Sequence, residues 1–256
     1  MKIISVVPES LVEWPGHLSY VIFLAGCNLK CKYCYVPHLA LPERYEKMPE
    51  IPKEKVIEDI KKRASSSKKW LDAVCITGGE PTIHEQELYD FLQKIKQESN
   101  IKIRLETNGT NPDLLERLLR QKLIDSIALD IKNSKQGYKE ISDVRGAAEL
   151  VAETISLVKS LGLRGFDYEF RTTLVPGIHT AKDLEEIADW IYAASPVGTA
   201  KKMTYFLQQF RTDLPNQETV APEFMKRGNY PLKEMEKIKQ KLEALGYFEK
   251  VEIRAK

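Results

Sequence analysis

The sequence lacks a charge excess, a long apolar run and an export signal, and each absence excludes a class of protein. Its 256 residues carry 39 basic and 37 acidic side chains, and a net charge of +2 does not favour a nucleic-acid-binding surface. The longest apolar stretch, Tyr20 to Cys27, is far shorter than the roughly 20 residues that cross a bilayer. Residues 1–16 contain neither a long apolar core nor a small-residue cleavage site. We therefore expect a cytoplasmic protein that binds neither nucleic acid nor membrane.

The sequence also lacks internal repeats, low-complexity tracts and Gly/Ser-rich linkers. Hydrophobic residues make up 43% and charged residues 30% of the chain, which is typical of a globular protein. A chain of this length buries about 70–75% of its unfolded surface, so its core needs no disulfide. We expect one domain over residues 1–256, with residues 1–18 and 212–256 as flanking extensions.

Six short apolar runs alternate with amphipathic stretches, and this rhythm predicts strands that alternate with helices. The predicted helices have apolar faces formed by Leu88, Phe91, Leu92 and Ile95; by Leu114, Leu115, Leu118 and Leu119, after Asn111 and Pro112; by Leu184, Ile187, Ala188 and Ile191, after Thr180; and by Met235, Ile238 and Leu242, after Pro231. The predicted strands are Tyr20–Leu24, Ala73–Ile76, Ile101–Glu106, Ser126–Asp130, Tyr168–Leu174 and Met203–Leu207.

Alternating strands and helices predict an α/β fold with a mostly parallel sheet. The pattern fits both a curled partial barrel and a flat doubly wound sheet, and periodicity does not choose between them. In either case the functional groups are expected beyond the carboxyl ends of the strands.

Cysteine is scarce, with four residues in the chain, yet Cys27, Cys31 and Cys34 fall within eight positions. Few cysteines without an export signal favour metal or redox chemistry over disulfides. Three local thiolates can bind a cubane iron–sulfur cluster and leave one iron open to a ligand that is not protein. A structural zinc site is the alternative, and it needs a fourth ligand such as Cys75, His17 or His38. Cys75 lies in an apolar run, so its simplest interpretation is a buried core residue.

Polar or glycine-rich segments come at the ends of the predicted strands, where the functional groups are expected. Each of them alone is consistent with an ordinary turn or a solvated pair. Their recurrence at successive strand ends favours a shared site. After the cysteine segment, they are Thr77-Gly78-Gly79-Glu80-Pro81, Glu106-Thr107-Asn108-Gly109, Asp130-Ile131-Lys132, Arg171 with Val175-Pro176-Gly177, and Gln208-Gln209.

The spacing Cys27-x3-Cys31-x2-Cys34, with Tyr33 before the last cysteine, resembles the motif of the radical S-adenosylmethionine (SAM) superfamily. Gly78-Gly79-Glu80-Pro81 is similar to the glycine-rich motif of that superfamily. The resemblance implies a partial (β/α)6 barrel and a [4Fe–4S] cluster bound by the three cysteines. It also implies that SAM chelates the fourth iron and is cleaved to a 5′-deoxyadenosyl radical, which abstracts a hydrogen atom.

The same resemblance implies which residues contact SAM. Glycines at 78 and 79 let the backbone approach the methionyl amine closely. Acidic groups at Glu106 and Asp130 suit an ammonium or ribose hydroxyls, whereas Lys132 or Arg171 suits the carboxylate. The other candidates are Tyr33 and Tyr35 beside the adenine, together with Glu80, Thr107, Asn108, Gln208 and Gln209. Glu106, Thr107 and Asp130 would also share a monovalent-cation site.

A narrower resemblance covers both ends of the chain. It rests on Ser10-Leu11-Val12-Glu13-Trp14-Pro15-Gly16, Phe23-Leu24-Ala25-Gly26-Cys27-Asn28 and Tyr205-Phe206-Leu207-Gln208-Gln209-Phe210-Arg211. These segments resemble the glycyl-radical-enzyme activases, most of all those of anaerobic ribonucleotide reductase. The resemblance implies that reductase as protein substrate and a low-potential electron donor such as flavodoxin or ferredoxin.

Three positions depart from the activase pattern. Tyr35 and Val36 stand where histidine and asparagine are usual, the glutamine pair stands where pyruvate formate-lyase activases have histidine, and Thr212 stands where proline is common. A radical SAM enzyme that acts on a small molecule or another polypeptide is the alternative. With only Cys75 left, the chain has too few cysteines for a second cubane. A zinc-binding adaptor is a third hypothesis.

Overall fold

The computed structural model describes residues 1–65, 71–141, 144–162, 165–194, 203–213 and 217–255. It forms two compact units. The first comprises Met1–Asn28, His38–Thr107 and Asp113–Ile127, and the second comprises Leu29–Pro37, Asn108–Pro112 and Ala128–Lys256. The prediction of a single domain is not tested by this division and stays a prediction.

The first unit contains a sheet in which chain order and spatial order agree, β1-β2-β3-β4. β1 pairs antiparallel with β2, and the remaining pairs are parallel. The strands are β1 (Ile3–Ser10), β2 (Ser19–Leu24), β3 (Ala73–Gly78) and β4 (Lys102–Thr107). The helices are α1 (Pro37–Ala40), whose first residue belongs to the second unit, α2 (Pro42–Tyr45), α3 (Lys53–Ala64), the 3-10 helix η1 (Pro81–His84), α4 (Glu85–Ser99) and α5 (Pro112–Arg120), whose first residue also belongs to the second unit.

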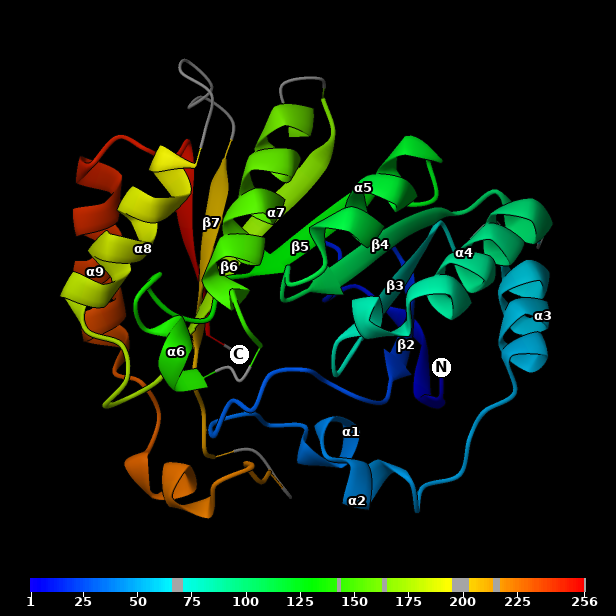
Figure 1. The fold of residues 1–256 in the computed structure, drawn as a ribbon, viewed down its shortest axis with the longest axis horizontal. Helices are drawn as coiled ribbons and strands as arrows, with labels where there is room; N and C mark the ends of the chain where they lie inside the picture. The colour runs from blue at the N-terminus through cyan, green and yellow to red at the C-terminus, as the bar shows by residue number, and fades with distance from the viewer. Residues whose placement is uncertain (66–70, 142–143, 163–164, 195–202, 214–216, 256) are drawn as a thin grey trace. The chain divides into compact units, whose positions relative to one another are not determined.

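Helix α4 covers the sheet of the first unit with the apolar face that its sequence predicts. Leu88, Phe91, Leu92 and Ile95 are all buried, and α3 packs beside α4 (Figure 1). Helix α5 begins at Pro112 as expected, and it buries three of its four predicted leucines but not Leu119. This packing removes apolar surface from water, which stabilises the fold by about 25 cal/mol for each Å² buried.

The second unit contains a parallel sheet in the order β6-β7-β8. Strand β5 (Ser126–Asp130) is divided, because its first two residues belong to the first unit. The other strands are β6 (Asp167–Leu174), β7 (Thr204–Gln209) and β8 (Lys250–Arg254). The helices are α6 (Tyr138–Ile141), α7 (Ala147–Gly162), α8 (Ala181–Ala193), the 3-10 helix η2 (Pro222–Arg227) and α9 (Leu232–Ala244).

Helices α8 and α9 lie side by side in the second unit (Figure 1). Helix α8 begins after Thr180, which forms a capping box with Asp183. Pro231 occupies the N-cap position of α9, and Met235, Ile238 and Leu242 are buried as predicted. No helix in the described part of the chain is both long and apolar enough to cross a membrane.

Two strands extend the predicted set of six. β1 lies within residues 1–18 and pairs with β2, whereas β8 lies within residues 212–256 and pairs with β7. Both predicted extensions therefore contribute a strand to the sheet of their unit. The six predicted strands are all present, with ends that differ by at most two residues; the first residue of the sixth, Met203, lies just before β7.

Candidate functional site

In the first unit, the glycine-rich turn after β3 is fastened to the residues just before Cys27. The Gly79 N–H donates to the Leu24 carbonyl at 2.9 Å, and the Glu80 N–H donates to the Gly26 carbonyl at 2.7 Å. A Cβ on Gly79 would lie 2.0 Å from the Gly26 oxygen. Because backbone atoms cannot give way as a flexible side chain can, position 79 requires glycine. The glycine-rich motif is thus in direct backbone contact with the residues that come just before the first cysteine.

Gly78 is required for two reasons. Its φ is +127°, which side chains rarely allow, and a Cβ there would lie 2.2 Å from the Leu24 oxygen. The turn therefore runs against the backbone of β2 without side chains between them.

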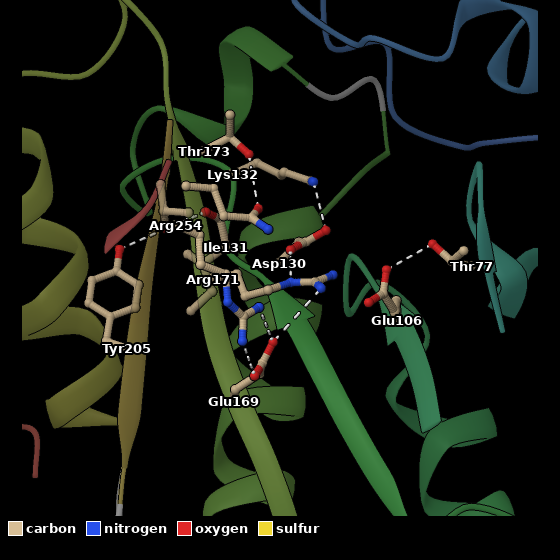
Figure 2. A network of polar contacts seen from close by, with 12 residues as sticks. Thr77, Glu106, Asp130, Ile131, Lys132, Glu169, Arg171, Thr173, Tyr205 and Arg254 are labelled. Atoms are coloured by element: carbon tan, nitrogen blue, oxygen red, sulfur yellow. Dashed lines mark hydrogen bonds and ion pairs between the residues drawn. The ribbon is translucent and has the colours of Figure 1, made fainter. Parts of the chain in front are cut away.

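Glu80 is buried, and its carboxylate holds the turn to β4. Its Oε1 accepts hydrogen bonds from the Thr82 N–H at 3.0 Å, the Thr82 hydroxyl at 2.6 Å and the Thr107 hydroxyl at 2.7 Å. Glu106 accepts a hydrogen bond from the Thr77 hydroxyl at 2.9 Å (Figure 2). Glu80 thus fixes η1 against the end of β4, and Glu106 and Thr107 are joined to the glycine-rich segment.

In the second unit, Asp130 at the end of β5 joins the two cations expected at the site. Its Oδ2 accepts from the Lys132 ammonium at 3.0 Å, and its Oδ1 accepts from Arg171 Nε at 2.7 Å (Figure 2). Burial raises the pKa of Asp130, but the charges of Arg171 and Lys132 outweigh it and hold this pKa at about 2. Burial likewise lowers the pKa of Lys132, and the Asp130 carboxylate raises it to about 12. Both groups are therefore charged at neutral pH.

Arg171 also belongs to a second group of ion pairs, with Glu169 of β6 and Arg254 of β8. Its Nη1 lies 3.8 Å from Glu169, and Glu169 accepts two hydrogen bonds from Arg254 of β8 at 2.8 and 2.9 Å. Neither Glu169 nor Arg254 lies in a motif that the sequence alone reveals. The signal was present, because Glu169, Arg171 and Thr173 alternate along β6 and so share one face.

The cysteines are all free thiols in the structure. Cys31 and Cys34 form a tight turn in the second unit, where the Cys34 N–H donates to the Cys31 carbonyl at 3.0 Å. Burial raises the pKa of Cys31 to about 11 and also raises that of Cys34, while the charge of Lys132 acts to lower both. Cys27 lies in the first unit, directly after the Gly26 that contacts the glycine turn.

The cysteines and the Asp130–Lys132 pair suit the iron–sulfur cluster and the SAM that the sequence implies. Soft thiolate ligands favour an iron–sulfur cluster, and paired positive and negative side chains suit the zwitterionic end of an amino acid. Among the described residues, no three His, Cys, Asp or Glu side chains converge as ligands of a single metal ion. A cubane instead binds each thiolate at a different iron.

Cys75 is the buried core residue that its apolar surroundings indicate. It is fully buried among Trp14, Val21 and Ala73 in the first unit. Burial raises the pKa of the Cys75 thiol to about 12. Since metals bind the thiolate form, this environment opposes a ligand role for Cys75.

The two tyrosines of the cysteine segment have different partners in the second unit. The Tyr33 hydroxyl donates to the Lys132 carbonyl at 3.4 Å, and its ring is buried. Tyr35 is half-buried and stacks on Phe210 with 4.9 Å between the ring centroids, and its hydroxyl accepts from the Arg211 N–H. Tyr35 thus ties the cysteine segment to the residues that follow β7.

The remaining candidates are also held by local contacts in the second unit. The Asn108 side-chain oxygen accepts from the N–H and hydroxyl of Thr110. Gln208 accepts from the Thr173 hydroxyl at 3.2 Å, whereas Gln209 donates to the Tyr230 carbonyl at 2.6 Å. Their predicted contacts with SAM stay predictions.

The comparison with protein families gives a match over most of the chain. Residues 21–191 match the family model described as "Radical SAM superfamily". This range includes the three cysteines, the glycine turn, Asp130, Lys132 and Arg171.

Relatives with several different names are similar to this sequence. A Methanocaldococcus jannaschii protein, named provisionally as a glycyl-radical enzyme activating enzyme, is 33% identical over 72% of each chain. The pyruvate formate-lyase-activating enzyme of Clostridium pasteurianum is 28% identical over 71% of this chain and 72% of its own length. The 7-carboxy-7-deazaguanine synthase of Methanothermobacter thermautotrophicus is 30% identical over 63% of each chain.

Among solved structures, anSMEcpe with bound AdoMet resembles this chain with a TM-score of 0.59 and 20% identity. The likeness covers 90% of this chain and 62% of that one, so the chain spans less than two thirds of that protein's length. It shows the fold and confirms the predicted α/β class. The chain belongs to the radical SAM superfamily, and relatives described as activating enzymes support its resemblance to the activase group.

Proposed function

We propose that the protein is an activase that cleaves SAM reductively and installs a glycyl radical in a partner enzyme. Cys27, Cys31 and Cys34 would hold a [4Fe–4S] cluster, which when bound supplies the electron that cleaves SAM to methionine and a 5′-deoxyadenosyl radical. That radical would take a hydrogen atom from the Cα of a glycine and leave 5′-deoxyadenosine and a glycyl radical. Among activase substrates, we propose an anaerobic ribonucleotide reductase.

The observation that carries this proposal is the backbone contact between the glycine turn and the segment before Cys27. Gly79 has no room for a side chain beside the Gly26 carbonyl. The two segments therefore form a closely packed backbone strip next to the first cysteine, and SAM would bind beside this strip.

The polar residues have distinct roles in the proposal. Asp130 and Lys132 carry opposite charges in a partly buried setting, each 22% exposed. The methionyl end of SAM carries an ammonium and a carboxylate. Its carboxylate can approach the Lys132 ammonium, which Asp130 keeps oriented. Arg171 is 7% exposed and serves to hold Asp130. Glu80 orients the glycine turn, because its carboxylate is hydrogen-bonded to Thr82 and Thr107.

The glycyl-radical target rests on sequence similarity. Relatives described as activating enzymes match about 70% of this chain. The segments Trp14-Pro15-Gly16 and Gln208-Gln209-Phe210-Arg211 extend the resemblance to both ends. A flavodoxin or ferredoxin as electron donor follows from the same resemblance, as does the monovalent-cation site, and each stays a prediction.

The test is electron paramagnetic resonance of the reconstituted protein with SAM, a reductant and a candidate anaerobic ribonucleotide reductase. The proposal predicts a glycyl doublet that needs all three components. A reductase variant whose radical-bearing glycine is replaced by alanine is the matched control and should give no signal. If SAM is cleaved but no co-encoded glycyl radical enzyme gives a doublet, the activase assignment is wrong.

A second candidate function is radical chemistry on a small molecule. It is favoured by the 30% identity to a 7-carboxy-7-deazaguanine synthase over 63% of each chain. Both functions share the proposed SAM site and differ in the substrate. The same experiment separates them, because a small-molecule enzyme leaves no radical on a protein glycine.

A further inference from the structure

The peptide groups of Lys132 are hydrogen-bonded by side chains. Strand β5 ends at Asp130, and the next residue, Ile131, bonds to β6: its N–H donates to the Arg171 carbonyl, and its carbonyl accepts from the Thr172 hydroxyl. Beyond it, the Lys132 N–H donates to the Tyr138 hydroxyl at 3.0 Å. The Lys132 carbonyl accepts from His179 Nε2 at 3.0 Å. The Tyr33 hydroxyl donates to that carbonyl as well. We call Tyr33, Tyr138 and His179 the Lys132 collar, because each of them bonds to a peptide group of Lys132.

His179 is the residue of the collar with two opposed hydrogen bonds. Its Nδ1 accepts from the Val175 N–H at 3.0 Å, whereas its Nε2 faces the Lys132 carbonyl. One nitrogen must therefore accept and the other must donate, which only the neutral Nε2–H tautomer can do. The side chain is 3% exposed, and burial lowers the pKa of His179 to about 4. The imidazole is neutral at physiological pH, as this geometry requires.

The imidazole is also fixed from its own backbone. The Tyr230 hydroxyl donates to the His179 carbonyl at 2.9 Å, and the capping box of α8 begins at the next residue. The Tyr33 ring meets the imidazole edge-on, with 6.3 Å between centroids. His179 therefore connects the end of β6, the start of α8 and the cysteine segment to one peptide group, that of Lys132.

Asp130 orients the Lys132 ammonium, and the place of that ammonium also depends on where the Lys132 Cα lies. We propose that His179 is a positioning residue for SAM binding: by donating from Nε2 to the Lys132 carbonyl, it fixes the backbone from which Lys132 meets the methionyl carboxylate. This inference rests on the proposed function, in which Lys132 binds that carboxylate. Tyr33, which stands between two cluster cysteines, would tie the same carbonyl to the cysteine segment.

Two amide substitutions separate the two hydrogen bonds of His179. In His179→Gln, the side-chain amide nitrogen reaches the place of Nε2 and can still donate to Lys132. In His179→Asn, the amide oxygen reaches the place of Nδ1 and can still accept from Val175. A role confined to stabilising the loop through Val175 would make His179→Asn the milder change. Positioning of Lys132 makes His179→Gln the milder change.

The experiment measures the dissociation constant of SAM for the anaerobically reconstituted full-length protein by calorimetry. We expect His179→Asn to raise this constant about tenfold, the effect of one lost buried hydrogen bond, and His179→Gln to raise it less than about threefold. Iron content and melting temperature are measured for each variant. Iron content should match the unaltered protein.

Lys132→Met completes a double-mutant cycle. If His179 acts through Lys132, adding His179→Asn to Lys132→Met should raise the dissociation constant less than about twofold further. Equal effects of His179→Asn and His179→Gln, or full additivity with Lys132→Met, would overturn the inference while the proposed SAM site stands. No effect of Lys132→Met alone would overturn the role of Lys132 in the proposed function, and the inference with it.

Discussion

Glu80 and His179 act at the residue scale by holding a neighbour in place. Glu80 follows two glycines whose backbone faces the segment before Cys27, and its carboxylate is engaged by Thr82 and Thr107. Sequence motifs identify such a residue but not its partners, because Thr107 is 27 positions away. His179 lies in none of the motifs identified from the sequence. Its partner Lys132 is 47 positions away, and only the fold brings the two together.

The motif residues that sequence reasoning located best are those defined by backbone chemistry. Gly78 and Gly79 were predicted to let the backbone approach the methionyl amine. The structure shows that both glycines lie against the backbone of Leu24 and Gly26, and their contact with SAM stays a prediction. Asp130 and Lys132 were predicted as SAM contacts, with an ordinary solvated pair as the alternative. The strength of their ion pair could not be predicted, because Arg171 joins it from another strand.

Replacing Gly79 with alanine should weaken SAM binding strongly. The added Cβ would lie 2.0 Å from the Gly26 carbonyl oxygen, so the turn or the segment before Cys27 must move. We expect the dissociation constant of SAM to rise at least about tenfold, which corresponds to about 1.4 kcal/mol. Gly246→Ala is the control, because it adds strain at a positive φ in open space and should leave SAM binding unchanged. Unchanged affinity in Gly79→Ala would exclude the proposed backbone strip.

Replacing Cys75 with alanine should cost only packing. The thiol is fully buried in an apolar cluster, and its loss leaves a small cavity worth about 1 kcal/mol of unfolding free energy. Iron and sulfide content after reconstitution should equal that of the unaltered protein, whereas Cys31→Ala should lose the cluster. Loss of iron in Cys75→Ala would contradict ligation by three cysteines and revive a fourth protein ligand.

The pKa of Asp130 makes stability depend on pH in the acid range. Its folded value of about 2 lies below the ordinary 3.8, so the carboxylate stabilises the fold fully above pH 4. This contribution, about 2 kcal/mol, is lost as the pH falls from about 4 to about 2. Denaturant unfolding should therefore show a shallower acid loss in Asp130→Asn than in the unaltered protein. Parallel pH profiles of the two proteins would be evidence against this ion pair.

At the scale of elements, periodicity predicted α4, α5, α8 and α9, but it singled out neither α3 nor α7 and missed the edge strands. Helices α4, α8 and α9 bury the residues that their spacing indicates, because one apolar face is enough to define them. β1 was missed since it contains Pro8 and exposes Val7. β8 was missed since it is short and alternates charged with apolar residues. Both extend their sheets, and strands in such places carry weaker apolar signals than central strands.

Helix α8 should depend on its capping box. The Thr180 hydroxyl and N–H both donate to Asp183 Oδ2, at 2.6 and 2.7 Å, and the Asp183 N–H donates back to the hydroxyl at 3.4 Å. Thr180→Ala should lower the free energy of unfolding by about 1 kcal/mol, measured by urea denaturation. Thr180→Ser keeps the hydroxyl and should lose less. Equal losses in the two variants would show that the cap is not the cause.

At the scale of the whole molecule, the candidate site residues are distributed over two compact units. Cys27, the glycine turn and Glu106 belong to the first, whereas Cys31, Cys34, Asp130 and Lys132 belong to the second. The spacing of the cysteines and the polar residues at strand ends suggested this set, and the resemblance to the radical SAM superfamily joined its members into one predicted site. The sequence did not predict the substrate, because relatives that match this chain are named for different reactions.

The central claim is that three cysteines hold a cluster at which SAM is cleaved, and one assay tests it most directly. The reconstituted protein is reduced with dithionite in the presence of SAM, and 5′-deoxyadenosine is quantified by chromatography. The account predicts that the unaltered protein and Cys75→Ala form 5′-deoxyadenosine, whereas Cys27→Ala, Cys31→Ala and Cys34→Ala do not. Formation by any of these three variants at the rate of the unaltered protein, or none by a fully iron-loaded unaltered protein, would contradict it.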